Sequence, residues 1–188
     1  MVVAHYCGHR MARPGFGGAF IPAAEQAVAR AIAEALEALG VAAAFGSLSS
    51  GADILAAEAA LARGAELHVV LPFGPRRFKA EAVVPSGAEW ERRFDASVRR
   101  ATSIEVLPGE VEATDRAYAT SARRAMDRTV LRARMLGTEP VQIAVWDGKP
   151  VIDGSTVDAE LREWQLTGLH SCIIPPSWSR HPKSVKSV

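Results

Sequence analysis

Short apolar segments alternate with amphipathic segments along most of this chain of 188 residues. The apolar segments are rich in Val, Leu, Ile and Ala, which is typical of strands that are covered on both faces. The segments between them carry apolar side chains at three- and four-residue spacing, which is typical of helices. Strands that alternate with helices form βαβ units and therefore a parallel sheet. The sequence predicts an α/β fold with a doubly wound, mainly parallel sheet of about six strands and helices on both faces.

The strands are expected at residues 1–7, 41–45, 67–71, 103–107, 141–146 and 169–174, and the helices at 23–39, 53–62, 78–83, 89–101, 114–136 and 156–166. Glycine ends the first two helices, at Gly40 and Gly64, as it commonly does after a last helical turn. We expect one domain over residues 1–174. Residues 175–188 are rich in Pro, Ser and basic side chains, which predicts a poorly ordered tail or a linker.

Composition narrows the classes of function. The formal net charge is +1, which gives no support for a nucleic-acid partner, an acidic substrate or a membrane surface. No apolar run approaches the ~20 residues that cross a bilayer, and the N-terminus lacks the pattern of a secretory signal. Cys7 and Cys172 lie in apolar runs and are interpreted as buried thiols in a reducing compartment. We therefore expect a cytoplasmic protein without a membrane partner, and the spacing of His and Cys predicts no metal site and no cofactor.

The stretch from Phe45 to Asp53, Phe-Gly-Ser-Leu-Ser-Ser-Gly-Ala-Asp, joins a predicted strand to a predicted helix. Small residues at such a junction expose backbone N–H groups, and the helix N-terminus adds partial positive charge. The residues expected to hold a phosphate or ribose here are Gly46, Ser47, Ser50 and Gly51. Asp53 is expected to cap the helix or occupy its first turn, and Glu58 is a candidate for a ribose. An ordinary strand–helix connection is the alternative interpretation.

Gly8, His9 and Arg10 follow the first predicted strand. Glycine allows the backbone to approach a ligand closely. An arginine binds a phosphate or carboxylate through two parallel hydrogen bonds, and a histidine donates to a ligand or transfers a proton. The alternative is a turn with a solvated arginine and a packed histidine.

A third turn follows the predicted strand at 141–146. Asp147 stands at the carboxyl end of that strand, where it is a candidate for a ribose hydroxyl or for a catalytic base. Gly154, Ser155 and Thr156 are expected to open the last helix and to present N–H groups to a phosphate. An Asp-Gly turn followed by a Ser/Thr cap is the alternative. Because ligands bind beyond the carboxyl ends of the strands in such sheets, the three turns together predict a nucleotide-type ligand.

Two segments resemble the SLOG superfamily, whose Rossmann-like domains are related to the LOG and DprA proteins. Ser49 to Glu58, followed by Ala60 to Pro72, is similar to the Ser-Gly-x-x-x-Gly-Ile-Asp region of DprA-like proteins and its continuation. Asp153 to Thr156 is similar to the Gly-Gly-x-Gly-Thr turn of the LOG branch. The resemblance is to bacterial members and implies a Rossmann-like domain that binds nucleotides or nucleotide-derived ligands, often as a sensor.

The leading hypothesis is therefore a nucleotide-binding sensor or carrier domain, with a homodimer as an option. The alternative is a nucleoside-monophosphate N-glycosidic hydrolase of the LOG type, a phosphoribohydrolase. Aligning on Thr156 places Ala159 where LOG enzymes carry their glutamate, and Glu160 follows one residue later. The carboxylate for hydrolysis would come from Glu160, Asp158 or Asp147.

A third hypothesis is a binder of single-stranded nucleic acid. It requires a basic groove that connects Arg10 or Arg13 with Arg124 and Arg128. Arg124, Arg128 and Arg132 follow one another at four-residue spacing, and a solvated helix face is the favoured interpretation of that stripe. The neutral net charge also disfavours nucleic acid.

Overall fold

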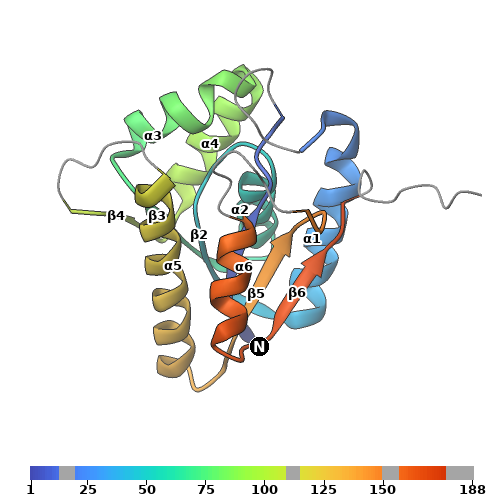
Figure 1. The fold of residues 1–188 in the computed structure, drawn as a ribbon, viewed down its shortest axis with the longest axis vertical. Helices are drawn as coiled ribbons and strands as arrows, with labels where there is room; N and C mark the ends of the chain where they lie inside the picture. Colours follow the sequence, from blue (N-terminus) through green and yellow to red (C-terminus); the bar gives the residue numbers. More distant parts are fainter. Residues whose placement is uncertain (13–19, 109–114, 150–156, 177–188) are drawn as a thin grey trace, which may run out of the picture.

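The computed structural model describes residues 1–12, 20–108, 115–149 and 157–176. Six strands form one sheet in which every neighbouring pair is parallel, in the order β4-β3-β2-β1-β5-β6. The strands are β1 (Val2–Gly8), β2 (Val41–Gly46), β3 (Glu66–Leu71), β4 (Ser103–Val106), β5 (Glu139–Val145) and β6 (Ser171–Ile174). The predicted α/β fold with a doubly wound, parallel sheet is confirmed (Figure 1).

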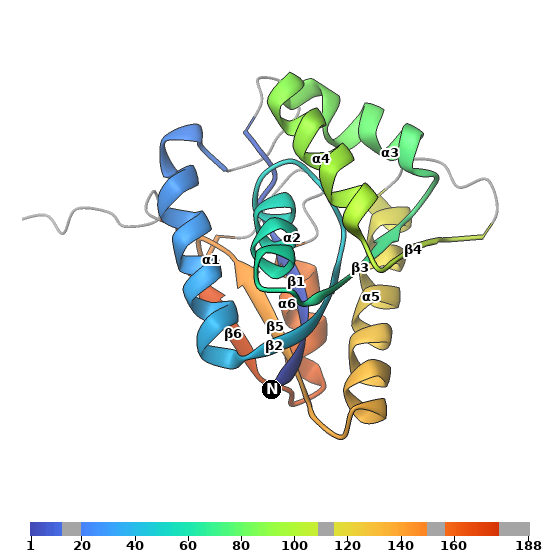
Figure 2. The ribbon, with the colours of Figure 1, turned by 180° about the vertical axis from the view of Figure 1, so that it is seen from behind.

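The described helices cover both faces of the sheet. They are α1 (Glu25–Leu39), α2 (Ala52–Ala62), α3 (Pro75–Ala82), α4 (Ala88–Arg100), α5 (Asp115–Met135) and α6 (Val157–Leu166), with short 3-10 turns η1 (Pro22–Ala24) and η2 (Val84–Ser86). Helices α5 and α6 pack on one face, whereas α1 and α2 pack on the other and α4 packs against α2 (Figures 1 and 2). None of these helices is long and apolar enough to cross a membrane.

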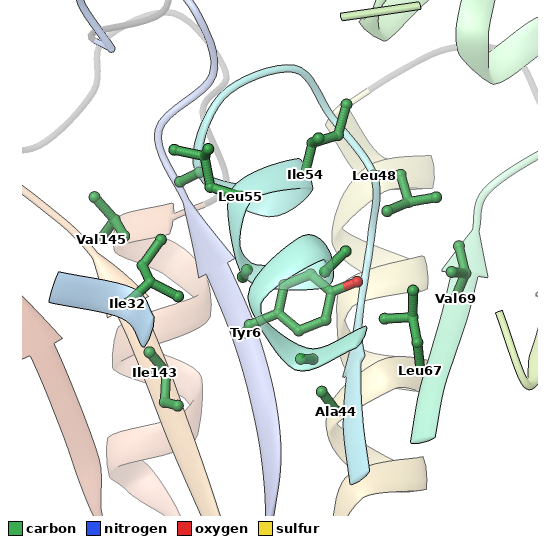
Figure 3. Close-up of a cluster of buried hydrophobic side chains, with 14 of the residues drawn as sticks. Tyr6, Ile32, Ala44, Leu48, Ile54, Leu55, Leu67, Val69, Ile143 and Val145 are labelled. Carbon is green, nitrogen blue, oxygen red and sulfur yellow. The ribbon is translucent and has the colours of Figure 1, made fainter. Parts of the chain in front are cut away.

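The alternation of side chains along β1 determines what each face of the sheet buries. Ala4 and Tyr6 belong to the large core cluster that includes α1 and α2, whereas Val3 and Cys7 belong to two smaller clusters beneath α5 and α6. Figure 3 shows the large cluster, in which the Tyr6 ring lies beside Ala44 and Leu67. Successive residues of a strand point to opposite faces, so β1 contributes to both layers.

The chain adds its strands first on one side of β1 and then on the other. From β1 the chain adds β2, β3 and β4 on one side, and it then returns to add β5 and β6 on the other. Because all strands are parallel, their carboxyl ends lie at one edge of the sheet. The loops after β1 and β5 therefore diverge there and leave the crevice in which α/β sheets bind ligands.

The element bounds agree closely with the sequence expectations, and the main difference is at α3. That helix begins at Pro75 rather than at Phe78. Proline suits the first turn of a helix because its missing N–H has no intrahelical partner there. Phe78, Trp90 and Phe94 are buried, so these aromatic residues belong to the core.

Gly46→Ala is expected to destabilise the fold by about 1–3 kcal/mol, the usual cost of an overpacked core. A Cβ at this position would lie 2.5–2.7 Å from three atoms of the Tyr6 ring, whose hydroxyl donates a 2.9 Å hydrogen bond to the Ser47 carbonyl. Urea unfolding monitored by circular dichroism measures the change. Gly74→Ala is the matched control because nothing lies within 4 Å of its added Cβ. Equal stability of the two variants would contradict this account of Gly46.

Candidate functional site

Two of the predicted turns lie side by side at the carboxyl edge of the sheet. The loop after β1 pairs with the loop after β2 through an isolated antiparallel bridge between Arg10 and Gly51. The Met11 N–H donates to the Ser50 carbonyl over 3.0 Å, and the Ala52 N–H donates to the His9 carbonyl over 3.1 Å. These hydrogen bonds fix the end of β1 against the start of α2.

The glycines of this edge are needed for close packing. A Cβ on Gly8 would lie 2.3 Å from the Cβ of Ala52. Gly51 has a φ of +105°, and its Cβ would lie 2.7 Å from the His9 carbonyl oxygen. Only glycine fits such a φ without strain. Gly8, Gly46 and Gly51 therefore have packing roles that do not depend on a ligand, and their contact with a ligand stays a prediction.

Several polar groups of the loop after β2 already have partners in the protein. The Ser49 N–H donates to Asp53 Oδ2 over 3.3 Å, and the Ser50 N–H donates to the Ala82 carbonyl over 3.2 Å. The Ser50 and Ser86 hydroxyls lie 2.7 Å apart. Asp53 lies in the first turn of α2, so its carboxyl group takes the place where an anion was expected. The Ser49 and Ser50 N–H groups therefore already donate within the protein, and phosphate binding by this loop stays a prediction.

A small cavity lies beneath the edge, with a volume of about 40 Å³. Its polar lining includes His5, Cys7, Arg10, Ser47, Asp53 and Glu160. A cavity of this size has room for water-sized guests and not for a nucleotide. A larger ligand would have to lie above the edge, with at most one of its groups entering the cavity.

Arg10 and Asp53 place groups of opposite charge in this cavity, together with Glu160. The Arg10 guanidinium carbon lies 4.4 Å from the centroid of the Tyr118 ring, which holds the cation by a cation–π contact. The pKa of Asp53 is raised to about 7, mainly by burial and also by the nearby Glu160 carboxylate, although Arg10 and the Ser49 N–H oppose both effects. Asp53 is therefore poised to change its charge near neutral pH.

His9 and Asp147 pair with each other at the carboxyl ends of β1 and β5. His9 Nε2 lies 3.1 Å from Asp147 Oδ1, and both side chains are buried. The Lys149 N–H also donates to Asp147 Oδ1, over 3.1 Å. Burial lowers the pKa of His9, and the carboxylate of Asp147 partly offsets that effect. The structure thus brings together two predicted site residues from distant parts of the sequence.

A second cluster, formed by His5, Cys7 and Glu160, lines the cavity. Glu160 Oε2 is 3.2 Å from His5 Nε2. Burial raises the pKa of the Cys7 thiol, with further contributions from Glu160 and Asp53. Sequence reasoning assigned Cys7 to the core and did not consider His5. The available signal was the His-x-Cys spacing, which places both side chains on one face of a strand.

The neighbouring position on α6 points away from the sheet. Ala159, which aligns with the glutamate of LOG enzymes, is exposed, whereas the Glu160 side chain is largely buried beside His5. One helical residue corresponds to a rotation of about 100°, which separates these two directions. Glu160 is therefore the residue of this pair that reaches the cavity.

Other predicted residues have different surroundings. Glu58, a candidate for a ribose, instead faces α4, where Arg93 donates to its two carboxylate oxygens over 2.8 and 2.5 Å. Gly154, Ser155 and Thr156 lie outside the described residues, so their predicted contact with phosphate stays a prediction.

The arginine stripe of α5 faces acidic side chains of β3 and β4. Arg128 donates to both carboxylate oxygens of Glu105, over 2.7 and 3.0 Å. Arg132 likewise donates to Glu66 over 2.7 Å. The positive charge of the stripe is therefore largely balanced within the protein, which disfavours its use as a nucleic-acid groove.

No family model and no curated protein matches the sequence. Among solved structures, the chain is similar to the X-ray structure of DNA processing protein A (DprA) from Streptococcus pneumoniae. That similarity has a TM-score of 0.34 and 13% sequence identity, and it covers 95% of this chain. The chain spans 60% of that protein. At this TM-score the likeness carries no weight for function, which has to be inferred from the site itself.

Asp53→Asn is expected to stabilise the protein increasingly as the pH rises from about 4 to about 7. The pKa of Asp53 is about 7 in the folded state, above the ordinary value, so its ionisation costs stability as pH rises through the interval between the two values. That cost is at most ~1.4 kcal/mol per pH unit, and Asn does not incur it. Thermal unfolding of both proteins at each pH measures it.

The exposed Asp127 provides the control, and Asp127→Asn should show no such trend. A difference between Asp53→Asn and the parent protein that stays constant with pH would contradict the raised pKa.

Proposed function

We propose that the carboxyl edge of the sheet binds a nucleotide or a nucleotide-derived ligand, and that the chain acts as a sensor or carrier domain. The observation that carries this proposal is the His9–Asp147 pair, which joins the ends of β1 and β5 at the switch point, with Arg10 next to His9 in the chain. Such crevices are where α/β sheets bind nucleotides. The resemblance to the SLOG superfamily supports the same class of ligand.

The residues of the edge have complementary roles in this proposal. Arg10 neutralises a phosphate, and its stacking on Tyr118 fixes the direction of the guanidinium before the ligand arrives. His9 and Asp147 offer a donor and an acceptor for ribose hydroxyls. Because the cavity beneath has only about 40 Å³, the base lies above the edge and outside it. Gly154, Ser155 and Thr156 are proposed to add backbone donors for the phosphate.

Charge at Asp53 would link ligand binding to pH. The carboxyl group lines the same cavity as Arg10 and has a pKa of about 7. A phosphate at Arg10 is repelled by an ionised Asp53 and accepted by a protonated one, because like charges disfavour each other. Binding of the anion should therefore be stronger below neutral pH.

Arg10→Ala is expected to weaken nucleotide binding at least about tenfold, the cost of losing one charge-assisted hydrogen bond pair. Isothermal titration calorimetry with a panel of AMP, ADP-ribose and a cyclic dinucleotide measures the dissociation constants. Arg30→Ala is the matched control because Arg30 is exposed on α1, which packs on the other face of the sheet from α5. Absence of binding to every ligand of the panel by the folded parent protein would remove the proposal, and equal binding by Arg10→Ala would remove Arg10 from it.

The second candidate is hydrolysis of the N-glycosidic bond of a nucleoside monophosphate. One observation favours it: the Glu160 carboxylate lines the cavity beneath the edge and lies 3.2 Å from His5. A buried carboxylate beside an imidazole is suited to orient or deprotonate a water.

Glu160→Gln is expected to abolish release of free base if this second reaction occurs, because the amide cannot accept a proton. Chromatography of reactions with AMP and GMP measures the free base. The control is Glu163→Gln, since Glu163 lies on the same helix as Glu160 but pairs with Arg123 of α5. If the parent protein releases no free base, the hydrolase candidate is removed and only the binding function remains.

A further inference from the structure

Three side chains with metal-ligating atoms meet beneath the carboxyl edge of the sheet. His5 and Cys7 are two residues apart on β1 and project from the same face, while Glu160 comes from α6. One ligating atom from each of the three lies within 4.8 Å of the other two. The described part of the chain thus brings a nitrogen, a sulfur and an oxygen donor together from two distant segments.

The hydrogen bonds of this part of the protein are incomplete. His5 is only 1% exposed, yet its Nδ1 has no hydrogen-bond partner among the described residues. The buried hydroxyl oxygen of Ser47 has none either, and both residues line the same cavity of about 40 Å³. Buried polar atoms almost always have a partner, so these two atoms indicate a guest in the cavity.

We propose that His5, Cys7 and Glu160 bind a divalent metal ion of the zinc type, with a fourth coordination position open to the cavity. A set of imidazole, thiolate and carboxylate ligands is typical of Zn²⁺. Three protein ligands with one open position are the arrangement of sites that bind water or substrate. This proposal stands independently of nucleotide binding.

The distance between two of the three ligand atoms already fits such an ion, and the third atom, Cys7 Sγ, lies within 4.8 Å of both. Zn–N and Zn–O bonds are about 2.1 Å long, which places two tetrahedral ligands about 3.4 Å apart. The 3.2 Å between His5 Nε2 and Glu160 Oε2 is close to that value. The cavity wall also carries a second carboxyl group, Asp53, opposite the single cation Arg10, so the charges of the wall favour a cation.

Neighbouring side chains hold the three ligands in place. The Gln142 amide donates to Cys7 Sγ over 3.8 Å and to the Glu160 carbonyl over 3.4 Å. The Ser171 hydroxyl donates to the same amide, over 3.2 Å. The Trp164 ring stacks on His5 with centroids 5.9 Å apart. Such supporting contacts orient metal ligands and are a regular part of metal sites.

Binding of the ion moves two protons. The Cys7 thiol loses its proton to solvent, because the thiolate is the ligand. The imidazole of His5 binds through Nε2, so its one proton moves from Nε2, where it faces the Glu160 carboxylate, to Nδ1, where a water in the cavity accepts it. The cavity has room for such a water. Metal binding should therefore release about one proton per ion and strengthen as the pH rises.

The test uses the full chain, treated with a chelator and then titrated with Co²⁺, which reports thiolate ligation by a near-ultraviolet charge-transfer band. We expect equimolar binding, the appearance of that band, and its loss when Zn²⁺ is added. Cys7→Ser should abolish the band. Loss of an outer-shell partner typically weakens metal binding about 10–100-fold, and Glu160→Gln, which removes a direct ligand, should weaken it by more than that. Cys172→Ser is the matched control, because Cys172 lies on β6 and packs against the large core cluster.

Circular dichroism verifies that each variant is folded, and Glu160→Gln keeps the test decisive if Cys7→Ser does not fold. Absence of equimolar binding by the folded parent protein would overturn the proposal. So would a band that persists in folded Cys7→Ser, or binding that is unchanged in Glu160→Gln. The titration contains no nucleotide, so failure to bind nucleotides leaves its result unaffected.

Discussion

The close contact between the end of β1 and the start of α2 is the constraint on which the rest of the site depends. Gly8 has no room for a Cβ because Ala52 lies against it, and Gly51 adopts a positive φ so that its backbone can pair with Arg10. This contact brings Arg10 over the cavity and holds Asp53 beside it. A larger side chain at either glycine would separate the two segments and disperse the polar groups that they carry.

That packing has an electrostatic consequence. Asp53 is buried at the N-terminus of α2 with Glu160 nearby. Its pKa is about 7 because burial and Glu160 raise it by more than Arg10 and the Ser49 N–H lower it. Two carboxyl groups, those of Asp53 and Glu160, therefore lie at this edge of the sheet, and a phosphate site by itself does not require them. The cavity wall thus carries the carboxyl groups of Asp53 and Glu160 together with the Arg10 guanidinium. The carboxyl groups underlie the proposed metal site, and the guanidinium underlies the proposed phosphate contact.

Much of this arrangement could be predicted from the sequence, and the failures have physical reasons. Hydrophobic periodicity depends only on local geometry, so it located the strands, most helices and the edge where the loops meet. It could not show that Asp53 would turn back to accept from Ser49 N–H, or that Glu58 would face Arg93. It also passed over His5, because a histidine in an apolar strand has no local signature until its partner on another element is known.

By itself, the sequence determined that the fold is a parallel α/β sheet and in which order strands and helices follow along the chain. The alternation of buried strands and amphipathic helices permits few other folds. It also determined that Gly8, His9 and Arg10 would lie at a carboxyl end. Only the tertiary structure decided which groups meet there. His9 with Asp147 and His5 with Glu160 are pairs separated by more than a hundred residues. Such pairs form only when the sheet is assembled, because strand order and helix rotation, rather than local sequence, set the distances between them.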